Sequence, residues 1–206
     1  MYDKDYGSYY DIDVSGAAHT YAMGIHTSTI VGFYEDTGGD IHGFSKAGGT
    51  YTTLNVPGAI TTRAYGVDSD NIVGYYEDAS GYTHGFIFDG ISYTTLDNSW
   101  ASDTWAYGID GDKIVGHYYD GNPKPFIYMP YLGENVFRWL IVPGTYGSYA
   151  YAYAYGVDGD RIVGYYEDSS GDRGFLATII PAVPEPTTLS LLAVGVLMAC
   201  RKQRRR

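Results

Sequence analysis

The stretch AYGVDSDNIVGYYEDASGYTHGFIFDGISYTTL, residues 64–96, contains four short segments that are typical of β-strands. They are residues 64–67, 72–76, 84–88 and 93–96, and aromatic or β-branched residues dominate them, as they do in strands generally. Gly, Asp, Asn and Ser fill the joints between the segments, which indicates tight turns. The stretch therefore predicts a unit of four short strands.

The same pattern occurs four times along the chain of 206 residues. Its first element, Ala-x-Gly followed by Ile or Val, begins at Ala22, Ala64, Ala106 and Ala154, and the intervals are 42, 42 and 48 residues. The tripeptide Ile-Val-Gly follows each copy at the same intervals. A period near 42 with four strands fits a β-propeller blade, whose repeat is about 40–45 residues long. No segment before residue 187 shows sustained helical spacing of apolar residues, so we expect an all-β domain.

The two ends of the repeat array complement each other. The fourth copy ends near Leu176 without a counterpart of Tyr-Thr-Thr-Leu, whereas residues 9–17 align with residues 51–59. The N-terminal segment therefore resembles an orphan fourth strand, and pairing it with the last blade would hide two exposed sheet edges. We expect a β-propeller of about four four-stranded blades, closed by this strand and spanning residues 8–177. An open or incomplete array is the alternative.

The net charge of −11 is unevenly distributed. Five of the 13 basic residues lie within the last six positions, and the other 200 residues carry 8 basic and 24 acidic groups, a net charge of −16. Such an acidic body repels phosphate backbones, which argues against nucleic acid as a partner. The single cysteine, Cys200, excludes an internal disulfide framework and a zinc site built from several cysteines.

Residues 178–206 differ from the repeats. We expect a proline-rich linker at 178–186, a hydrophobic membrane segment at 187–200, which carries no charge, and a basic tail at 201–206. The apolar run is shorter than the roughly 20 residues of a usual spanning helix. The segment nevertheless has the order of a membrane-sorting signal, in which a short motif is followed by an apolar helix and then by basic residues that stop transfer across the membrane. The basic end should stay in the cytoplasm, which places the acidic body outside it.

This C-terminus resembles the PEP-CTERM sorting signal of Gram-negative bacteria. The resemblance rests on Pro184-Glu185-Pro186, the apolar run and the arginine-rich end. It implies recognition of Pro184, Glu185 and Pro186 by an exosortase, a membrane cysteine protease. It also implies export, transient anchoring in the inner membrane and delivery to the cell surface or medium, often in species that make exopolysaccharide and biofilm. Export needs a signal peptide, which residues 1–5 do not resemble, so we expect either a start site upstream or a fragment.

The repeats resemble, less specifically, the extracellular HAF-type repeat. The residues that carry this resemblance are His42-Gly43-Phe44 and His84-Gly85-Phe86. The third and fourth copies depart from it, because Lys124 and Arg173 stand in the place of the histidine. Since His42 and His84 repeat with the blades, we interpret them as structural.

Three copies carry an Asp-x-Asp turn whose carboxylates are candidate Ca²⁺ ligands. The pairs are Asp68 and Asp70, Asp110 and Asp112, and Asp158 and Asp160. Carboxylate oxygens suit Ca²⁺, but the spacing of an EF-hand loop is absent. Aspartate is also common in hairpin turns for local reasons, and we favour that interpretation.

The third copy is the place where a ligand site is expected, because it departs most from the other copies. The residues that we single out as possible ligand-binding residues are Trp100, Trp105, Tyr131, Glu134 and Trp139. Flat aromatic rings with polar tips suit stacking on sugar rings. The alternative is that they fill space where this blade is irregular.

The sequence contains no catalytic constellation that we recognise, and we assign no catalytic residue and no cofactor. Our first hypothesis is an exported, surface-sorted, non-enzymatic repeat protein that binds extracellular matrix or polysaccharide. The second is an extracellular glycan hydrolase or lyase that uses Asp103, Glu134 or His117 near the axis. The third is a structural protein stiffened by Ca²⁺.

Overall fold

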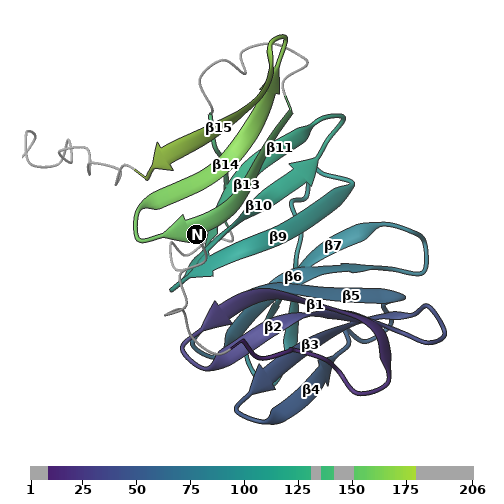
Figure 1. Cartoon of the computed structure of the whole chain (residues 1–206). Coiled ribbons are helices and arrows are strands. Elements are labelled where there is room, and N and C mark those ends of the chain that lie inside the picture. The colour runs from purple at the N-terminus through teal and green to yellow at the C-terminus, as the bar shows by residue number, and fades with distance from the viewer. Residues whose placement is uncertain (1–8, 131–135, 142–150, 180–206) are drawn as a thin grey trace, which may run out of the picture.

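The computed structural model describes residues 9–130, 136–141 and 151–179 (Figure 1). These residues form four successive units of antiparallel strands, and they contain no α-helix. Unit 1 comprises β1 (Ala17–His26), β2 (Thr29–Asp36), β3 (Ile41–Ala47) and β4 (Thr50–Leu54). Unit 2 comprises β5 (Thr61–Asp68), β6 (Asn71–Glu77), β7 (Thr83–Phe88) and β8 (Tyr93–Leu96). The all-β prediction is confirmed.

Units 3 and 4 repeat the same arrangement. Unit 3 comprises β9 (Asp103–Asp110), β10 (Lys113–Tyr119), β11 (Pro123–Met129) and β12 (Val136–Trp139). Unit 4 comprises β13 (Tyr151–Asp158), β14 (Arg161–Asp168) and β15 (Gly171–Thr178). The strands of each unit pair in chain order, and one parallel pair, Ile41 with Thr61, joins the sheets of units 1 and 2. The units follow one another from purple to green in Figure 1.

The Ala-x-Gly motif forms a β-bulge in the first strand of every unit. In unit 2, Ala64 pairs with Gly74 and Gly66 pairs with Val73, so Tyr65 is the extra residue. The register shifts in the same way in β1, β9 and β13. A bulge sharpens the local twist of a strand and re-aims its side chains. The first strands β1, β5, β9 and β13, which we call the inner strands, contact each other in series.

Glycine is required in this motif because consecutive inner strands approach each other closely. A Cβ atom on Gly66 would lie 2.6 Å from the carbonyl oxygen of Tyr107, the bulged residue of unit 3. A Cβ atom on Gly108 would lie 2.8 Å from the carbonyl oxygen of Tyr155, the bulged residue of unit 4. The glycine of one unit thus forms a slot for the bulge of the next unit.

The hydrophobic core is divided among the three junctions between units. At each junction, the valine of Ile-Val-Gly in one unit packs against two residues of the next unit. These two residues are the alanine of its Ala-x-Gly motif and the isoleucine of its Ile-Val-Gly motif. The sets are Val31 with Ala64 and Ile72, Val73 with Ala106 and Ile114, and Val115 with Ala154 and Ile162. We call the valine side of a unit its forward face and the alanine side its rear face. Burying both faces explains why the central strands carry bulky residues on both sides.

A threonine fixes the linker that leads into the inner strand of units 1 to 3, and this threonine is buried in units 2 and 3. The amide of Val56 donates to Oγ1 of Thr62 at 3.1 Å, and the amide of Asn98 donates to Oγ1 of Thr104 at 3.4 Å. The amide of Val14 donates to Oγ1 of Thr20 at 3.1 Å in the same manner. The predicted alignment of residues 9–17 with residues 51–59 therefore corresponds to a shared local conformation.

The predicted closure of the ring is not seen. The sheet of unit 4 has the order β13-β14-β15, and residues 9–14 form no strand. The amide of Asp13 instead donates to the hydroxyl of Tyr51 in unit 1 at 3.1 Å. Among the described residues, units 1 to 3 have the expected four strands and unit 4 has three, which corresponds to the open array. The predicted C-terminal helix lies outside the described residues, and the domain boundaries stay a prediction.

Candidate ligand-binding surface

Aromatic side chains of the inner hairpins form a band that crosses all four units. The residue before Ala-x-Gly pairs across the hairpin with the residue after Ile-Val-Gly. These pairs are Tyr21–Phe33, Arg63–Tyr75, Trp105–His117 and Tyr153–Tyr165. The bulged residues Tyr65, Tyr107 and Tyr155 lie among them, and we call the whole set the aromatic band.

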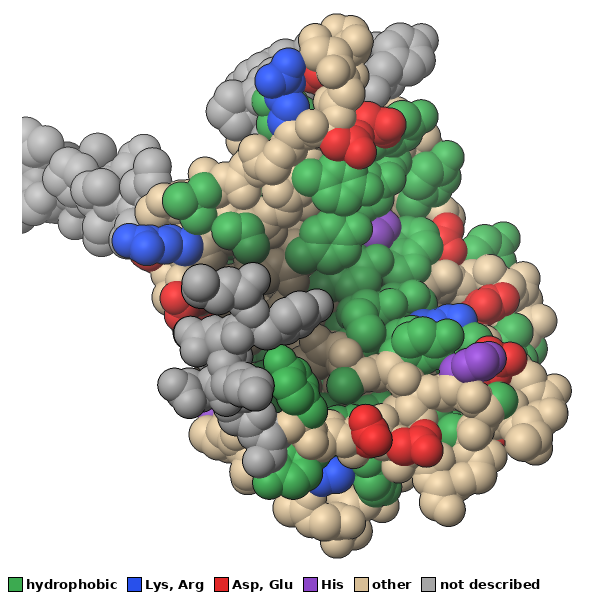
Figure 2. Space-filling view, in the orientation of Figure 1, with side chains coloured by type: hydrophobic (Ala, Val, Ile, Leu, Met, Phe, Trp, Pro, Cys, Tyr) green, Lys and Arg blue, Asp and Glu red, His purple; other side chains and the backbone are tan. Residues whose placement is uncertain are grey.

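Ring contacts make the band continuous from one unit to the next. The centroids of Tyr65 and Phe33 are 6.0 Å apart, those of Tyr65 and Tyr107 are 5.0 Å apart, and those of Tyr107 and Tyr155 are 4.9 Å apart. Figure 2 shows hydrophobic side chains gathered over the hollowed middle of this face. Most of the band is only partly buried, so its rings present surface to solvent.

His117 lies at the centre of the band in unit 3. Its ring stacks on Trp105 at a centroid distance of 4.5 Å and meets the ring of Tyr153 edge-on at 4.8 Å. The residue is 7% exposed, and within the described part of the chain its buried Nδ1 has no hydrogen-bond partner. Burial lowers the pKa of His117 to about 4, so the imidazole is neutral at neutral pH. An unsatisfied buried nitrogen is rare in native proteins and marks a position where a ligand group or water could bond.

The bulged tyrosines of the band keep their protons. Burial raises the pKa of Tyr65 and of Tyr107 far above the usual value, and burial raises the pKa of Tyr155 to about 12. Their hydroxyls are therefore neutral hydrogen-bond donors at any physiological pH. Arg63 supplies the one cation among the band's residues, with its guanidinium over the rings of Phe33 and Tyr75 at 5.5 and 5.7 Å. The band thus combines flat apolar rings with several polar tips.

A second repeated feature is a close contact between a turn aspartate and a basic side chain in the third strand of each unit. The pairs are Asp36–His42, Asp78–His84, Asp120–Lys124 and Asp168–Arg173. Lys124 and Arg173, which depart from the histidine pattern in sequence, therefore play the same part as the histidines. The prediction of HAF-type repeats as such is not shown, but the repeated element is a basic side chain that contacts the turn aspartate of its own unit.

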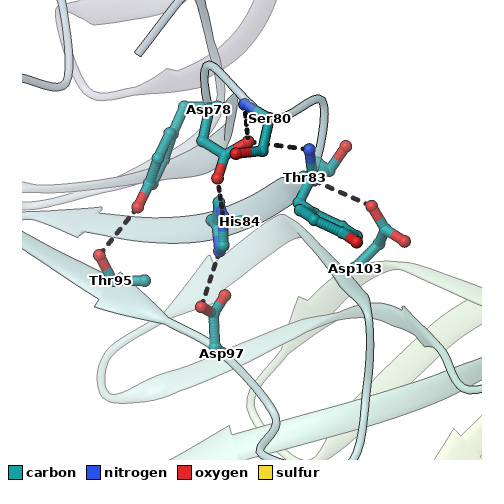
Figure 3. A network of polar contacts seen from close by, with 9 residues as sticks. Asp78, Ser80, Thr83, His84, Thr95, Asp97 and Asp103 are labelled. Carbon is teal, nitrogen blue, oxygen red and sulfur yellow. Dashed lines mark hydrogen bonds and ion pairs between the residues drawn. The ribbon is translucent and has the colours of Figure 1, made fainter. Parts of the chain in front are cut away.

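The pair in unit 2 belongs to a larger network, drawn in Figure 3. Asp78 accepts hydrogen bonds from the amides of Tyr82 and Ser80, which with the charge of His84 hold the pKa of Asp78 below its usual value. Burial opposes the charged form of His84, but the bonds and charges of Asp97 and Asp78 outweigh it and raise the pKa of His84. The side chains of Asp78, His84 and Asp97 thus bond one another and the amides of the turn, so we interpret the network as structural.

The structure brings together only some of the residues singled out from the sequence. Trp105 and His117 meet in the aromatic band. Trp100 is 85% exposed in the linker before β9, and Trp139, on the outer strand β12, lies under Nζ of Lys124. Asp103 accepts hydrogen bonds from the amide of Thr83 and the hydroxyl of Ser102. Tyr131, Glu134, Pro184, Glu185 and Pro186 lie outside the described residues.

The first aspartate of the Asp-x-Asp turns in units 2 and 3 joins each of these units to the next one. Asp68 accepts a hydrogen bond of 2.6 Å from the amide of Gly111, and Asp110 accepts one of 2.7 Å from the amide of Gly159. Asp68 also lies 2.9 Å from Nδ1 of His26, which occupies the same position in unit 1. Within residues 9–130, 136–141 and 151–179, no three His, Cys, Asp or Glu side chains gather in a way that could hold a metal ion.

A pocket of about 490 Å³ lies between units 1 and 2, away from the band. Residues 40–42 and the linker 55–62 line it, including His42 and Asn55, whose side chains share a hydrogen bond. None of the residues of the aromatic band contributes to this pocket.

Residues 182–206 match the PEP-CTERM protein-sorting motif. The chain therefore carries the C-terminal sorting motif of exported, surface-sorted proteins, as the sequence predicts. No curated protein matches the chain. In the part of the chain that the structure describes, no helix has the length and hydropathy needed to cross a membrane.

Two solved structures of Aleuria aurantia lectin show a weak likeness to the chain. A mutant in complex with Fucalpha1-6GlcNAc is 14% identical, with a TM-score of 0.36 over 74% of this chain and 61% of the lectin chain. The same mutant in complex with alpha-methyl-L-fucoside is 14% identical, with a TM-score of 0.31 over 78% of this chain and 64% of the lectin chain. The chain thus spans less than two thirds of the length of these lectin chains.

Sequence reasoning missed most of the aromatic band. It gave weight to the tryptophans because they lie in or beside the third copy, which departs most from the others, and it treated the repeated tyrosines as ordinary strand residues. A signal was present, since the positions directly before Ala-x-Gly and directly after Ile-Val-Gly carry an aromatic ring in seven of eight cases, counting His117 as a ring. What the sequence alone did not reveal is that a hairpin brings these two positions together.

Proposed function

We propose that this chain is an exported, surface-sorted, non-enzymatic repeat protein that binds a neutral polysaccharide along its aromatic band. The observation that carries the proposal is the unbroken series of rings from Phe33 through Tyr65 and Tyr107 to Tyr155. Aromatic faces bind the apolar faces of sugar rings, and polar tips beside them bond the hydroxyls. A band that crosses four similar units suits a polymer of similar sugars.

The charge of the chain selects among polysaccharides. Without the last six residues the chain carries a net charge of −16, so an anionic glycan would be repelled. Within the band, the guanidinium of Arg63 already makes cation–π contacts with the rings of Phe33 and Tyr75. A neutral glycan avoids both the long-range repulsion and the cost of removing charged groups from water.

The sorting motif supports the cellular part of the proposal. Recognition of Pro184-Glu185-Pro186 by an exosortase would deliver the repeat domain to the cell surface, where extracellular polysaccharide is found. Replacing Glu185 with alanine should leave the protein in the membrane fraction, as measured by fractionation of cells that express it. Release of this variant into the surface fraction at the normal level would contradict the assignment.

Binding is tested with a panel of soluble neutral and anionic polysaccharides in affinity electrophoresis. We expect retardation by at least one neutral polymer and a loss of about tenfold or more in affinity for Trp105→Ala, which removes a ring from the centre of the band. Trp100→Ala is the matched control, because Trp100 is exposed outside the band and its loss should leave binding unchanged. Failure of every polymer to bind, or equal effects of the two variants, would refute the proposal.

The same experiment addresses the alternative of a glycan hydrolase or lyase. His117 is the one residue of that hypothesis that lies in the band, and among the described residues its Nδ1 has no carboxylate partner that could orient it. We therefore expect the bound polymer to keep its length, as measured by size-exclusion chromatography after long incubation. Shortened polymer, with cleavage lost in His117→Phe, would support an enzyme instead.

A further inference from the structure

The forward face of unit 4 is exposed although its counterparts are buried. Val163 is 49% exposed, whereas Val73 and Val115, at the same position in units 2 and 3, are fully buried. Leu176 on β15 is 66% exposed, whereas its counterpart Ile127 is 2% exposed. In the described residues no fifth unit lies against this face.

The rear face of unit 1 is exposed in the same way. Ala22 is exposed, whereas Ala64, Ala106 and Ala154 are fully buried at the same position. Ile25 is 69% exposed, whereas its counterpart Val67 is 7% exposed. Both ends of one chain therefore present large apolar side chains at positions that the internal junctions bury wholly or in part, which marks them as interaction surfaces.

The two exposed faces are the two halves of a junction that the chain already forms three times. At each internal junction the glycine of Ala-x-Gly receives the carbonyl of the next bulged residue, as Gly66 receives that of Tyr107. At Gly156 the slot is open, since only a methyl group of Val163 lies within 4 Å of the Cβ position. Met23 is the bulged residue of unit 1 and carries the matching carbonyl. The faces therefore match in register as well as in hydrophobicity.

The chain also carries the strand that unit 4 lacks. In internal units the fourth strand ends just before the linker into the next inner strand, as β4 ends at Leu54 before β5. Residues 9–12 stand in this position before β1, and the bond from Val14 to Thr20 gives their linker the internal conformation. A unit 1 that docks on a unit 4 would thus bring residues 9–12 alongside the free edge of β15. Tyr9 and Tyr10 are 95% and 82% exposed, as expected of a segment without its partner.

We propose that the chain assembles head to tail with a second copy of itself, the rear face of unit 1 packing on the forward face of unit 4 of its neighbour. Residues 9–12 of one copy supply the fourth strand to unit 4 of the other. The interface is heterologous, because two different surfaces meet, and repetition gives either a closed ring or an extended array. This proposal is independent of polysaccharide binding.

The test is sedimentation velocity of the full chain in detergent micelles, with each substitution placing a charge on one face only. We expect the natural chain to form species of at least two copies. Val163→Arg, which blocks the forward face, and Ile25→Arg, which blocks the rear face, should each be monomeric. Ile91→Arg is the matched control, because Ile91 is 92% exposed in the β7–β8 turn and belongs to neither face, so it should assemble normally.

Mixing the two monomeric variants distinguishes this interface from others. The Val163→Arg chain keeps its rear face and the Ile25→Arg chain keeps its forward face, so an equimolar mixture should form dimers and nothing larger. A symmetric interface built on one face would leave the variant that is altered on the other face dimeric by itself, and association through the apolar segment 187–200 would survive both substitutions. A natural chain that is monomeric, including one whose own ends close on each other, would also overturn the proposal.

Discussion

Replacing Gly66 with alanine places a methyl group in the slot between units 2 and 3. The new Cβ would lie 2.6 Å from the carbonyl oxygen of Tyr107 and 3.0 Å from a methyl group of Val73. A carbon and an oxygen need about 3.2 Å, so the inner strands β5 and β9 must separate by roughly 0.6 Å. Overpacking of this kind destabilises proteins by about 1–3 kcal/mol. Removing a glycine from a strand recovers about 0.5–1 kcal/mol through the unfolded chain. We expect Gly66→Ala to lower the free energy of unfolding by about 1–2 kcal/mol on balance.

Gly156→Ala is the matched control, because it makes the same change in the same motif at the open end. Its Cβ would meet no backbone carbonyl and only a methyl group of Val163 at 3.1 Å, which can shift. We expect this variant to be unchanged or slightly more stable. Both are measured by urea unfolding followed by circular dichroism, at a concentration at which the chain is monomeric. Equal losses of stability in the two variants would refute the assignment of the glycines to packing between units.

Three further outcomes follow from the described contacts. The pKa of His117 is about 4 in the folded protein and about 6.5 in the unfolded chain, so the natural chain should lose about 3 kcal/mol of stability as the pH falls from 6.5 to 4. His117→Phe should abolish this loss, because phenylalanine takes up no proton. A pH profile of thermal unfolding that is the same for both chains would contradict the assignment. Thr62→Val leaves the buried amide of Val56 without its hydrogen-bond acceptor and should lower the free energy of unfolding by about 1–3 kcal/mol in a urea titration. Thr20→Val removes the equivalent bond at a partly exposed site and should have a smaller effect. Because Asp68 and Asp110 bond backbone amides of the next unit, EDTA should not change the melting temperature; a fall reversed by added Ca²⁺ would restore calcium as a structural ligand.

The sequence predicted the four units because their local signals agree. The strand composition, the turn residues and the period of 42 all indicate four-stranded units, and each predicted strand around Ile72 and Phe86 is present. The Ala-x-Gly motif is visible as a repeat, but the reason that it needs glycine, the close approach of a carbonyl from the next unit, depends on a bulge such as that at Tyr65. A register shift leaves no direct mark in the sequence.

The position of the N-terminal segment could not be predicted for a different reason. The alignment of residues 9–17 with residues 51–59 identifies what kind of strand the segment resembles, but not which sheet it joins. Pairing with its own unit 4 and pairing with another copy satisfy the same sequence pattern. Similarly, Lys124 and Arg173 look like departures from the histidine pattern until their bonds to Asp120 and Asp168 are seen.

The serial contact of β1, β5, β9 and β13 has a consequence for how such chains change length. Every junction is assembled from the same parts, so duplicating or deleting one unit of about 42 residues would leave the remaining junctions intact. Gene duplication could therefore lengthen the protein without any compensating substitution in the core. Each added unit would extend the row of rings by one pair, and a longer chain would lengthen the surface along which we propose that a polysaccharide binds.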